Sequence, residues 1–231
     1  MAPSLDALKR AAALRAADFV SSGTVIGLGT GSTVRPLLDA LAERLASGAL
    51  AEVGAVPTSE DTAARCRSLG IPLTSLEEHP RLALVIDGAD EIGPGLDLIK
   101  GLGGALLREK LVVGATRHFI VVADASKRVR RLGTRAPVPV EVVRFGWSLH
   151  LPFFAALGAE PALRCGPDGG PFVTDEGHYV VDCRFARGIA DPRALARALR
   201  SRPGVVEHGL FLGMARTAVI AGERGVRVIA R

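Results

Sequence analysis

Short apolar runs alternate with helical patterns through the first half of the chain, and this alternation limits the possible folds more than any other feature of the sequence. Apolar runs of this kind fit strands that are buried on both faces, as in a parallel sheet covered by helices. The expected strands are 24–28, 53–57, 82–86 and 118–123, and the expected helices are 4–20, 33–46, 59–69 and 104–115. The pattern predicts an α/β fold with a Rossmann-like, mostly parallel sheet and helices on both faces.

The order of the expected strands and helices changes after a basic, turn-rich connecting segment at 127–137. The order then expected is strand, helix, strand, strand, helix and strand, at 138–143, 147–157, 161–165, 178–183, 191–201 and 204–208. This is the split βαβ order of a ferredoxin-like α+β domain. Two final strands, 217–221 and 226–230, could return to the first sheet. We therefore predict an α/β domain of residues 1–132 and 209–231, into which a smaller α+β domain of residues 133–208 is inserted.

The overall composition narrows the classes of partner. The 231 residues carry a formal net charge of +5, but the arginines are dispersed and only 4% of the residues are aromatic, which argues against nucleic acid. No stretch approaches the roughly 18 apolar residues of a membrane span. The cysteines, Cys66, Cys165 and Cys183, lack the spacing of metal ligands. We expect a cytoplasmic protein with reduced thiols and with no nucleic-acid or membrane partner.

A glycine-rich segment with three hydroxyl residues, 27–33, follows the first expected strand and precedes a helix. Its exposed backbone N–H groups, the helix N-terminus and the hydroxyl groups together suit a phosphate. An ordinary turn with Ser/Thr capping is the alternative. A dinucleotide fingerprint would need glycine in place of Ser32, and a Walker loop would need a lysine that is missing. A nucleotide cofactor is therefore not expected.

Carboxylates cluster where the third expected strand ends, at Asp87 and Asp90. Ligands of an open parallel sheet bind at the carboxyl ends of the strands, so both side chains would face the same space as the glycine loop. Carboxylates held close together suit proton transfer. A turn in which aspartate caps a helix is the alternative for each of them.

Lysine is rare among the 29 basic residues, which makes its positions informative. Lys100 lies among glycines at 98–104, where its ammonium could reach a substrate oxygen. Lys127 follows the strand 118–123 and would face the same side of the sheet. Glu109 lies on a helix between two cations, and by pattern alone a solvated helix residue is the simpler interpretation.

Five segments together resemble the A-type ribose-5-phosphate isomerase family: GLGTGST at 27–33, DGADEI at 87–92, IKGLGGALLREK at 99–110, ADASK at 123–127 and PVPVEV at 137–142. The resemblance also implies a domain insertion and a homodimer. It implies that the substrate is bound by Thr30, Gly31, Ser32, Thr33, Asp87, Gly88, Ala89, Asp90, Lys100, Gly101, Leu102, Gly103 and Lys127, and that Glu109 is the proton acceptor. Two positions depart from the family, with Leu102 where glycine is usual and Leu107 where threonine is common.

The resemblance implies an aldose-ketose isomerase of the pentose phosphate pathway that interconverts D-ribose 5-phosphate and D-ribulose 5-phosphate. A hydride shift would need clustered metal ligands, which the sequence does not show, so an enediolate route without metal or cofactor is expected. Glu109 would move the proton from C2 to C1, and Lys100 would stabilise the oxyanion. Asp87 would shuttle the hydroxyl proton and Asp90 would orient substrate hydroxyls. Lys127, with Lys9 as a weaker candidate, would neutralise part of the phosphate charge.

Two rival functions belong to other classes. One is a sugar-phosphate-binding sensor without catalysis, which would carry a DNA-binding helix-turn-helix segment. The other is a dehydrogenase. Neither accounts for Asp87, Lys100 and Glu109 together.

Overall fold

The computed structural model describes residues 3–231, which form two compact units. Unit 1 contains the described residues up to Ala89, together with Arg108–Lys127 and Gly213–Arg231. Unit 2 contains Asp90–Leu107 and Arg128–Leu212. The inserted domain expected at 133–208 lies wholly within unit 2, and residues 1–2 of the other expected domain lie outside the described residues.

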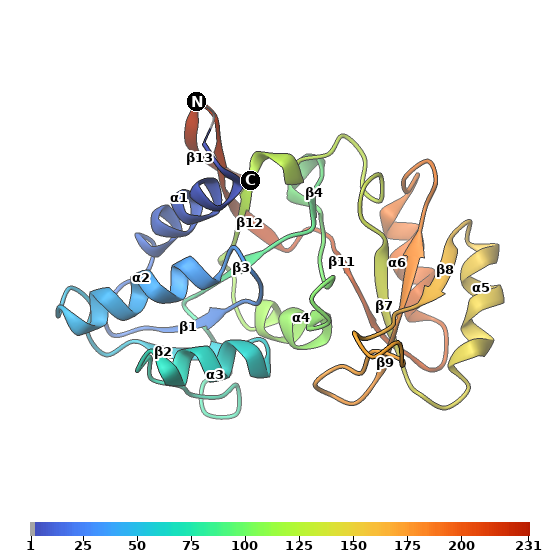
Figure 1. The fold of residues 1–231 in the computed structure, drawn as a ribbon, viewed down its shortest axis with the longest axis horizontal. Helices are drawn as coiled ribbons and strands as arrows, with labels where there is room; N and C mark the ends of the chain where they lie inside the picture. Colours follow the sequence, from blue (N-terminus) through green and yellow to red (C-terminus); the bar gives the residue numbers. More distant parts are fainter. Residues whose placement is uncertain (1–2) are drawn as a thin grey trace. The chain divides into compact units, whose positions relative to one another are not determined.

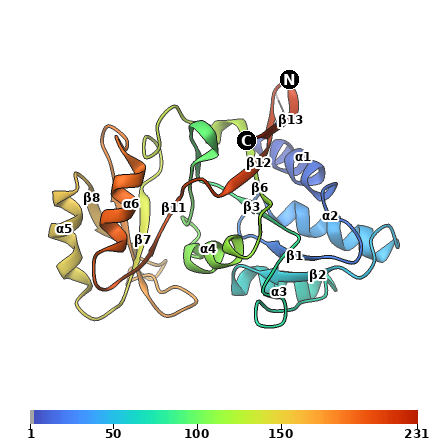
Figure 2. The same cartoon turned by 180° about the vertical axis from the view of Figure 1, so that it is seen from behind.

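Unit 1 is built on a six-stranded sheet in the order β13-β12-β6-β3-β1-β2. Neighbouring strands run parallel except β13, which pairs antiparallel with β12. The strands are β1 Val25–Leu28, β2 Gly54–Pro57, β3 Leu84–Gly88, β6 Phe119–Asp124, β12 Ala215–Gly222 and β13 Gly225–Ala230. Figure 2 shows β12, β6, β3, β1 and β2 following one another across this sheet. The mostly parallel α/β sheet is confirmed, and the final two strands do return to it.

Helices pack on both faces of this sheet. They are α1 Leu5–Ala17, α2 Arg35–Ala46, α3 Glu60–Ser68 and α4 Leu106–Gly114. The helices α1 and α2 lie side by side (Figure 1) and bury small and apolar side chains against alternate strand residues such as Ile26 and Ile120. On the opposite face Val112 of α4 packs so closely on β1 that a Cβ at Gly27 would lie 2.5 Å from it. Glycine at position 27 therefore allows α4 to approach the sheet.

Unit 2 contains a four-stranded antiparallel sheet in the order β10-β7-β9-β8, with two helices. Its elements are β7 Val138–Val142, α5 His150–Ala156, β8 Glu160–Leu163, β9 Tyr179–Arg184, α6 Pro192–Arg200 and β10 Val205–His208. By chain order these strands are fourth, first, third and second, which is the predicted split βαβ arrangement. A 3₁₀ turn at Trp147–Leu149 replaces the first turn of the helix expected at 147–157.

Three strands of two residues each were not predicted: β4 Glu91–Ile92, β5 Leu98–Ile99 and β11 Leu210–Phe211. They form a separate sheet in the order β11-β5-β4. The buried Glu91 carboxylate joins β4 to the segment before β7, because it accepts the backbone N–H groups of Gly133, Arg135 and Ala136 at 2.6–2.8 Å. These contacts explain why unit 2 also includes 90–107, 128–132 and 209–212, beyond the expected insertion.

Two expectations from the sequence concern the state of the cysteine thiols and the presence of a membrane-spanning segment. All three thiols are free, and burial raises the pKa of Cys66 to about 11 and that of Cys183 to about 12. Both buried thiols are therefore poor nucleophiles near neutral pH. Between residues 3 and 231, no helix has the length and apolar character needed to cross a membrane.

Candidate active site

The segments singled out in unit 1 follow three neighbouring strands. The strands β1, β3 and β6 are adjacent and parallel, so the glycine loop, Asp87 and Lys127 lie at the same edge of the sheet, where the strands end. In open α/β sheets this edge is where ligands bind. The fold therefore places a loop with hydroxyl groups, a carboxylate and an ammonium at the end of the sheet that suits a ligand.

Asp87 is fully buried at the end of β3 and fixes the start of the glycine loop. Its Oδ1 atom accepts the backbone N–H groups of Thr30 (3.1 Å) and Gly88 (2.6 Å). The carboxylate lies so close to the loop that a Cβ at Gly29 would be 1.9 Å from Oδ1. Only glycine fits at position 29 without displacing Asp87.

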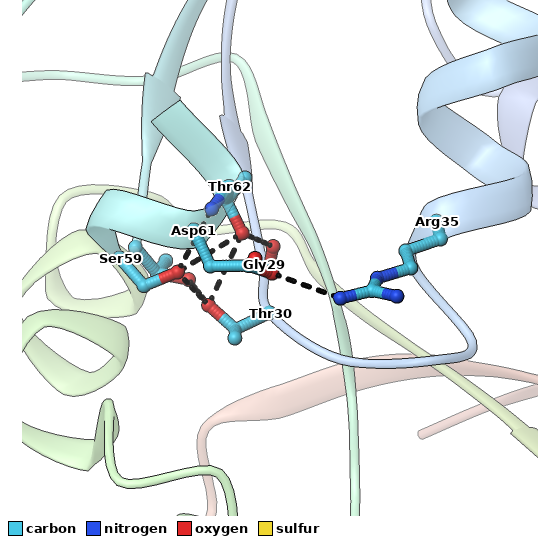
Figure 3. Close-up of polar contacts among 7 residues, drawn as sticks. Gly29, Thr30, Arg35, Ser59, Asp61 and Thr62 are labelled. Atoms are coloured by element: carbon cyan, nitrogen blue, oxygen red, sulfur yellow. Dashed lines mark hydrogen bonds and ion pairs between the residues drawn. The ribbon is translucent and has the colours of Figure 1, made fainter. Parts of the chain in front are cut away.

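Thr30 is held by a chain of hydroxyl groups that begins at the end of β2 (Figure 3). The Thr30 hydroxyl donates to Ser59 Oγ (2.7 Å), and Ser59 Oγ donates to Thr62 Oγ1 (3.1 Å). Thr62 in turn donates to the carbonyl of Gly29 (2.8 Å), and Thr58 Oγ1 lies 2.9 Å from Thr30 Oγ1. Because Ser59 also caps α3 through the Thr62 N–H, the chain joins the glycine loop to the start of that helix.

The rest of the glycine loop is more accessible. Gly31 has a φ of 111°, a conformation that favours glycine, and its carbonyl accepts the N–H of Arg35, where α2 begins. Ser32 is exposed and accepts a hydrogen bond from Lys9 Nζ at 3.0 Å. Lys9, the weaker candidate for neutralising the phosphate charge, thus contacts the loop directly and adds positive charge beside Ser32 and Thr33.

Glu109 is buried on α4, with 4% of its surface exposed. Its neighbours differ from the solvated pattern expected for a helix surface, because Lys110 is also buried and Arg108 forms an ion pair with Glu60 at 2.8 Å. That pair lowers the pKa of Glu60. The interpretation of Glu109 as a solvated helix residue is therefore wrong, and the structure supplies a buried carboxylate on a rigid element.

Lys127 follows β6 on a short 3₁₀ turn, Ala125–Lys127. The preceding residue of the strand, Asp124, is buried and accepts the Ser126 N–H at 2.9 Å. This Asp turn fixes the direction in which the chain leaves the sheet. The Lys127 side chain is half-buried.

In unit 2, Lys100 lies at the start of the second glycine-containing loop and is 2% exposed. Its backbone N–H donates to the carbonyl of Gly209 at 2.9 Å, and its Nζ atom lies 5.4 Å from the centre of the Phe211 ring. A Cβ at Gly209 would be 2.2 Å from the carbonyl oxygen of Lys100, so the two backbones touch. On the same loop the N–H of Leu102 donates to Asp90 Oδ2 at 3.0 Å.

The departure at Leu102 does not disturb the backbone of this loop. Left-handed φ values fall on Gly101 (103°) and Gly104 (85°), two of the three glycines in this loop. Leu102 is not among the described non-glycine residues with positive φ, which are Glu52 and Leu96. A side chain is therefore tolerated at position 102, and it is 42% exposed.

The structure places the candidate residues in two groups. Unit 1 holds Thr30–Thr33, Asp87–Ala89, Glu109 and Lys127, and unit 2 holds Asp90 and Lys100–Gly103. Their roles in binding and catalysis stay predictions.

The sequence interpretation missed the partners that hold these loops. Thr58, Ser59 and Thr62 support the first loop, and their signal was available, since they follow the end of a parallel strand and Ser59 precedes a helix. Arg164 contacts the second loop from 62 and 63 residues away in the chain. No local pattern could have indicated that contact.

Comparison with known proteins gives consistent matches. Residues 54–225 match the family model described as ribose 5-phosphate isomerase A (phosphoriboisomerase A). A ribose-5-phosphate isomerase A from Roseiflexus castenholzii is 61% identical over 94% of this chain and 93% of the relative. One from Synechococcus is 57% identical over 98% of each chain.

Solved structures agree with these relatives. A D-ribose-5-phosphate isomerase in complex with phospho-erythronic acid superposes with a TM-score of 0.96 at 35% identity, covering 99% of this chain and 100% of that one. The ribose 5-phosphate isomerase from Plasmodium falciparum gives a TM-score of 0.94 at 39% identity, covering 98% and 99%.

Proposed function

The chain belongs to the ribose 5-phosphate isomerase A family, and we propose that it interconverts D-ribose 5-phosphate and D-ribulose 5-phosphate through an enediolate intermediate. The observation that carries this proposal is the identity of 57–61% over at least 94% of the chain with ribose-5-phosphate isomerases A. The chain is accordingly an aldose-ketose isomerase whose substrate is a small sugar phosphate. Phospho-erythronic acid bound to a solved relative supports this class of ligand.

Glu109 is the proposed base. In the aldose its carboxylate takes the proton from C2, the electrons of that C–H bond form the enediolate, and the same proton returns to C1 to give the ketose. Its burial on α4 supports this role, since a base that acts on a carbon acid must be fixed in position and shielded from water. The helix supplies that rigidity.

The other ionisable groups would handle the oxygen atoms of the substrate. Lys100 would stabilise the negative charge that develops on the oxygen during enolisation. Asp87 would carry the proton that moves between the two hydroxyl oxygens. Asp90 would orient substrate hydroxyls, and because its Oδ2 atom accepts the Leu102 N–H it would also link that task to the lysine loop.

The phosphate would be bound by the accessible part of the first glycine loop. Because the Thr30 hydroxyl donates to Ser59, donation to phosphate oxygens would fall to Ser32 and Thr33. Lys9 and Lys127 would add positive charge. Binding energy from the phosphate, which does not react, would position the reacting carbons.

The test is a coupled assay of purified, chelator-treated full-length protein with ribose 5-phosphate, in which formation of ribulose 5-phosphate is followed. We expect turnover without added metal. Glu109→Gln should lower kcat by about 10²-fold or more with KM near the wild-type value, because a positioned base typically contributes that much. Glu43→Gln, on the exposed side of α2, is the matched control and should behave as wild type.

Each contrary outcome has its own meaning. Normal turnover in Glu109→Gln would reject this base. A requirement for added divalent metal would reject the metal-free scheme. Inactivity of a folded wild-type protein would favour the sensor without catalysis, which should still bind ribose 5-phosphate in a calorimetric titration.

Two further proposals follow from membership of the family. We propose a homodimer, which light scattering on the purified chain would test. We also propose a cytoplasmic location, which a fluorescent fusion in the source cell would test.

A further inference from the structure

Arg164 follows β8 in the sequence and contacts the lysine loop of the same unit. Its Nη1 atom donates to the carbonyl oxygens of Gly101 (3.1 Å) and Leu102 (3.0 Å). These are the two residues that follow Lys100. A single guanidinium nitrogen therefore ties two consecutive carbonyls of the loop to the antiparallel sheet.

The guanidinium group is itself held in place. Its Nε atom donates to Asp182 Oδ2 at 2.9 Å, and its Nη2 atom donates to Oδ1 of the same carboxylate on β9. Paired hydrogen bonds of this kind between arginine and a carboxylate are among the strongest and most directional in proteins. The Arg164 side chain is only 12% exposed, so solvent weakens this pair less than it would at an open surface.

The same group of side chains reaches the far end of the loop. Arg164 lies over the Phe172 ring, with Cζ 5.7 Å from its centre. That ring packs on Gly104, where an added Cβ would lie 2.3 Å from it. Arg164, Asp182 and Phe172 thus form one support along 101–104.

Asp90 holds the opposite side of one of the two peptide groups that Arg164 binds. In the peptide group that joins residues 101 and 102, the N–H of Leu102 donates to Asp90 and the carbonyl of Gly101 accepts from Arg164. Lys100 is fixed at its own backbone by Gly209. The loop is therefore bound at each residue from 100 to 102, although it has the glycines of a flexible segment.

We propose that Arg164, oriented by Asp182, is a positioning residue for the isomerisation: it sets the conformation of the 101–104 loop and thereby the position of the Lys100 ammonium. The proposal rests on the proposed function and adds a role for the split βαβ sheet. Lysine would replace arginine here only in part, because one ammonium cannot form the fork to a carboxylate while it donates to two carbonyls.

The experiment compares Arg164→Met and Arg164→Lys with a matched control, Arg144→Met. Arg144 makes similar contacts elsewhere in unit 2, donating to the Gly177 carbonyl and lying over the Tyr179 ring. We expect Arg164→Met to lower kcat roughly 10- to 100-fold, because a shift of about 1 Å in a catalytic group can cost about 10²-fold. Arg164→Lys should be intermediate. Inhibition by inorganic phosphate should be unchanged, because the phosphate-binding residues are on another loop.

A double-mutant cycle separates positioning from a general structural effect. In a Lys100→Ala background, which removes the group that Arg164 is proposed to place, Arg164→Met should lower the residual rate by less than about threefold. Equal losses in both backgrounds would overturn the proposal, and so would wild-type kcat in a folded Arg164→Met. If Arg164→Met does not fold, Arg164→Lys takes its place in the cycle. Inactivity of the wild-type protein would refute the proposed function instead.

Discussion

At the scale of single residues, the site depends on positions where no side chain fits. Gly29 is the clearest, since the Asp87 carboxylate occupies the space that a Cβ would need. We expect Gly29→Ala to displace Asp87 and to lower kcat/KM at least about 10²-fold, while overpacking reduces the free energy of unfolding by about 1–3 kcal/mol. Steady-state kinetics and urea unfolding would measure both effects.

Gly114→Ala is the control for that change. Gly114 lies at the end of α4, where an added Cβ would meet nothing within 4 Å. This variant should keep the wild-type rate and stability. An active Gly29→Ala enzyme would show that the loop can move away from Asp87 and that their contact is not required.

The hydroxyl chain behind Thr30 leads to a second residue-scale prediction. Thr62→Val keeps the shape of the side chain but removes the hydroxyl that donates to the Gly29 carbonyl. The glycine loop should therefore lose this hydrogen bond to α3. We expect KM for ribose 5-phosphate to rise several-fold with a smaller change in kcat, and the free energy of unfolding to fall by about 1 kcal/mol. Thr62→Ser should restore both.

Thr217→Val is the matched control for Thr62→Val. Thr217 is also buried in unit 1, and its hydroxyl lies 3.4 Å from Nε2 of His118. Loss of the Thr217 hydroxyl should change the free energy of unfolding but leave KM for ribose 5-phosphate unchanged. Equal KM values in Thr62→Val and wild type would show that the chain of hydroxyls is structural only.

At the scale of elements, periodicity predicted the long strands and helices of both sheets. The strand expected at 118–123 is β6, Phe119–Asp124, and the helix expected at 191–201 is α6, Pro192–Arg200. Two-residue strands such as β5 carry too few side chains for a period to show. The burial of Glu109 and the reach of Arg164 to the lysine loop depend on tertiary packing, so no local pattern contained them. The site was predictable where chemistry lies in consecutive residues, and not where distant segments hold it.

Strand β7 contains a buried carboxylate whose titration can be tested. Glu141 accepts hydrogen bonds from Thr174 and His178, but its Oε2 atom has no hydrogen-bond partner within residues 3–231. Burial, as the largest cause, raises the pKa of Glu141 above its ordinary value of 4.5. The folded state therefore binds this proton more tightly than the unfolded state. Its contribution to stability is present below about pH 4.5 and is lost as the pH rises through the raised pKa.

Glu141→Gln should remove this pH dependence while keeping the side-chain shape. We expect the urea midpoint of the wild type to fall relative to that of Glu141→Gln as the pH rises above 4.5. The single tryptophan, Trp147, is in unit 2 and meets the ring of Tyr179 edge-on at 6.4 Å, so its fluorescence reports this unit. Glu160→Gln, exposed on β8, is the control. If the urea midpoints of the wild type and Glu141→Gln differ by the same amount at every pH, the raised pKa of Glu141 does not contribute to stability.

At the scale of the whole molecule, neither unit is a continuous piece of chain. Unit 1 is made of three segments and unit 2 of two, so the chain changes from one unit to the other between residues 89 and 90, 107 and 108, 127 and 128, and 212 and 213. Asp90, Glu109 and Lys127 each lie within two residues of such a change of unit. Residues 128–212 alone would lack the strands β4 and β5 and the lysine loop, so every experiment above uses the full chain.

The net charge of the whole chain gives a final prediction. A formal charge of +5 should attract a sugar phosphate by its long-range field, and salt screens that field. We expect kcat/KM to fall several-fold between about 10 mM and 0.5 M sodium chloride, while kcat stays constant because the bound state is screened less. Glu43→Lys raises the charge to +7, since −1 is replaced by +1, and should steepen the dependence. A parallel fall in kcat would show instead that salt acts on the chemical step, and an unchanged kcat/KM would show that local contacts alone capture the phosphate.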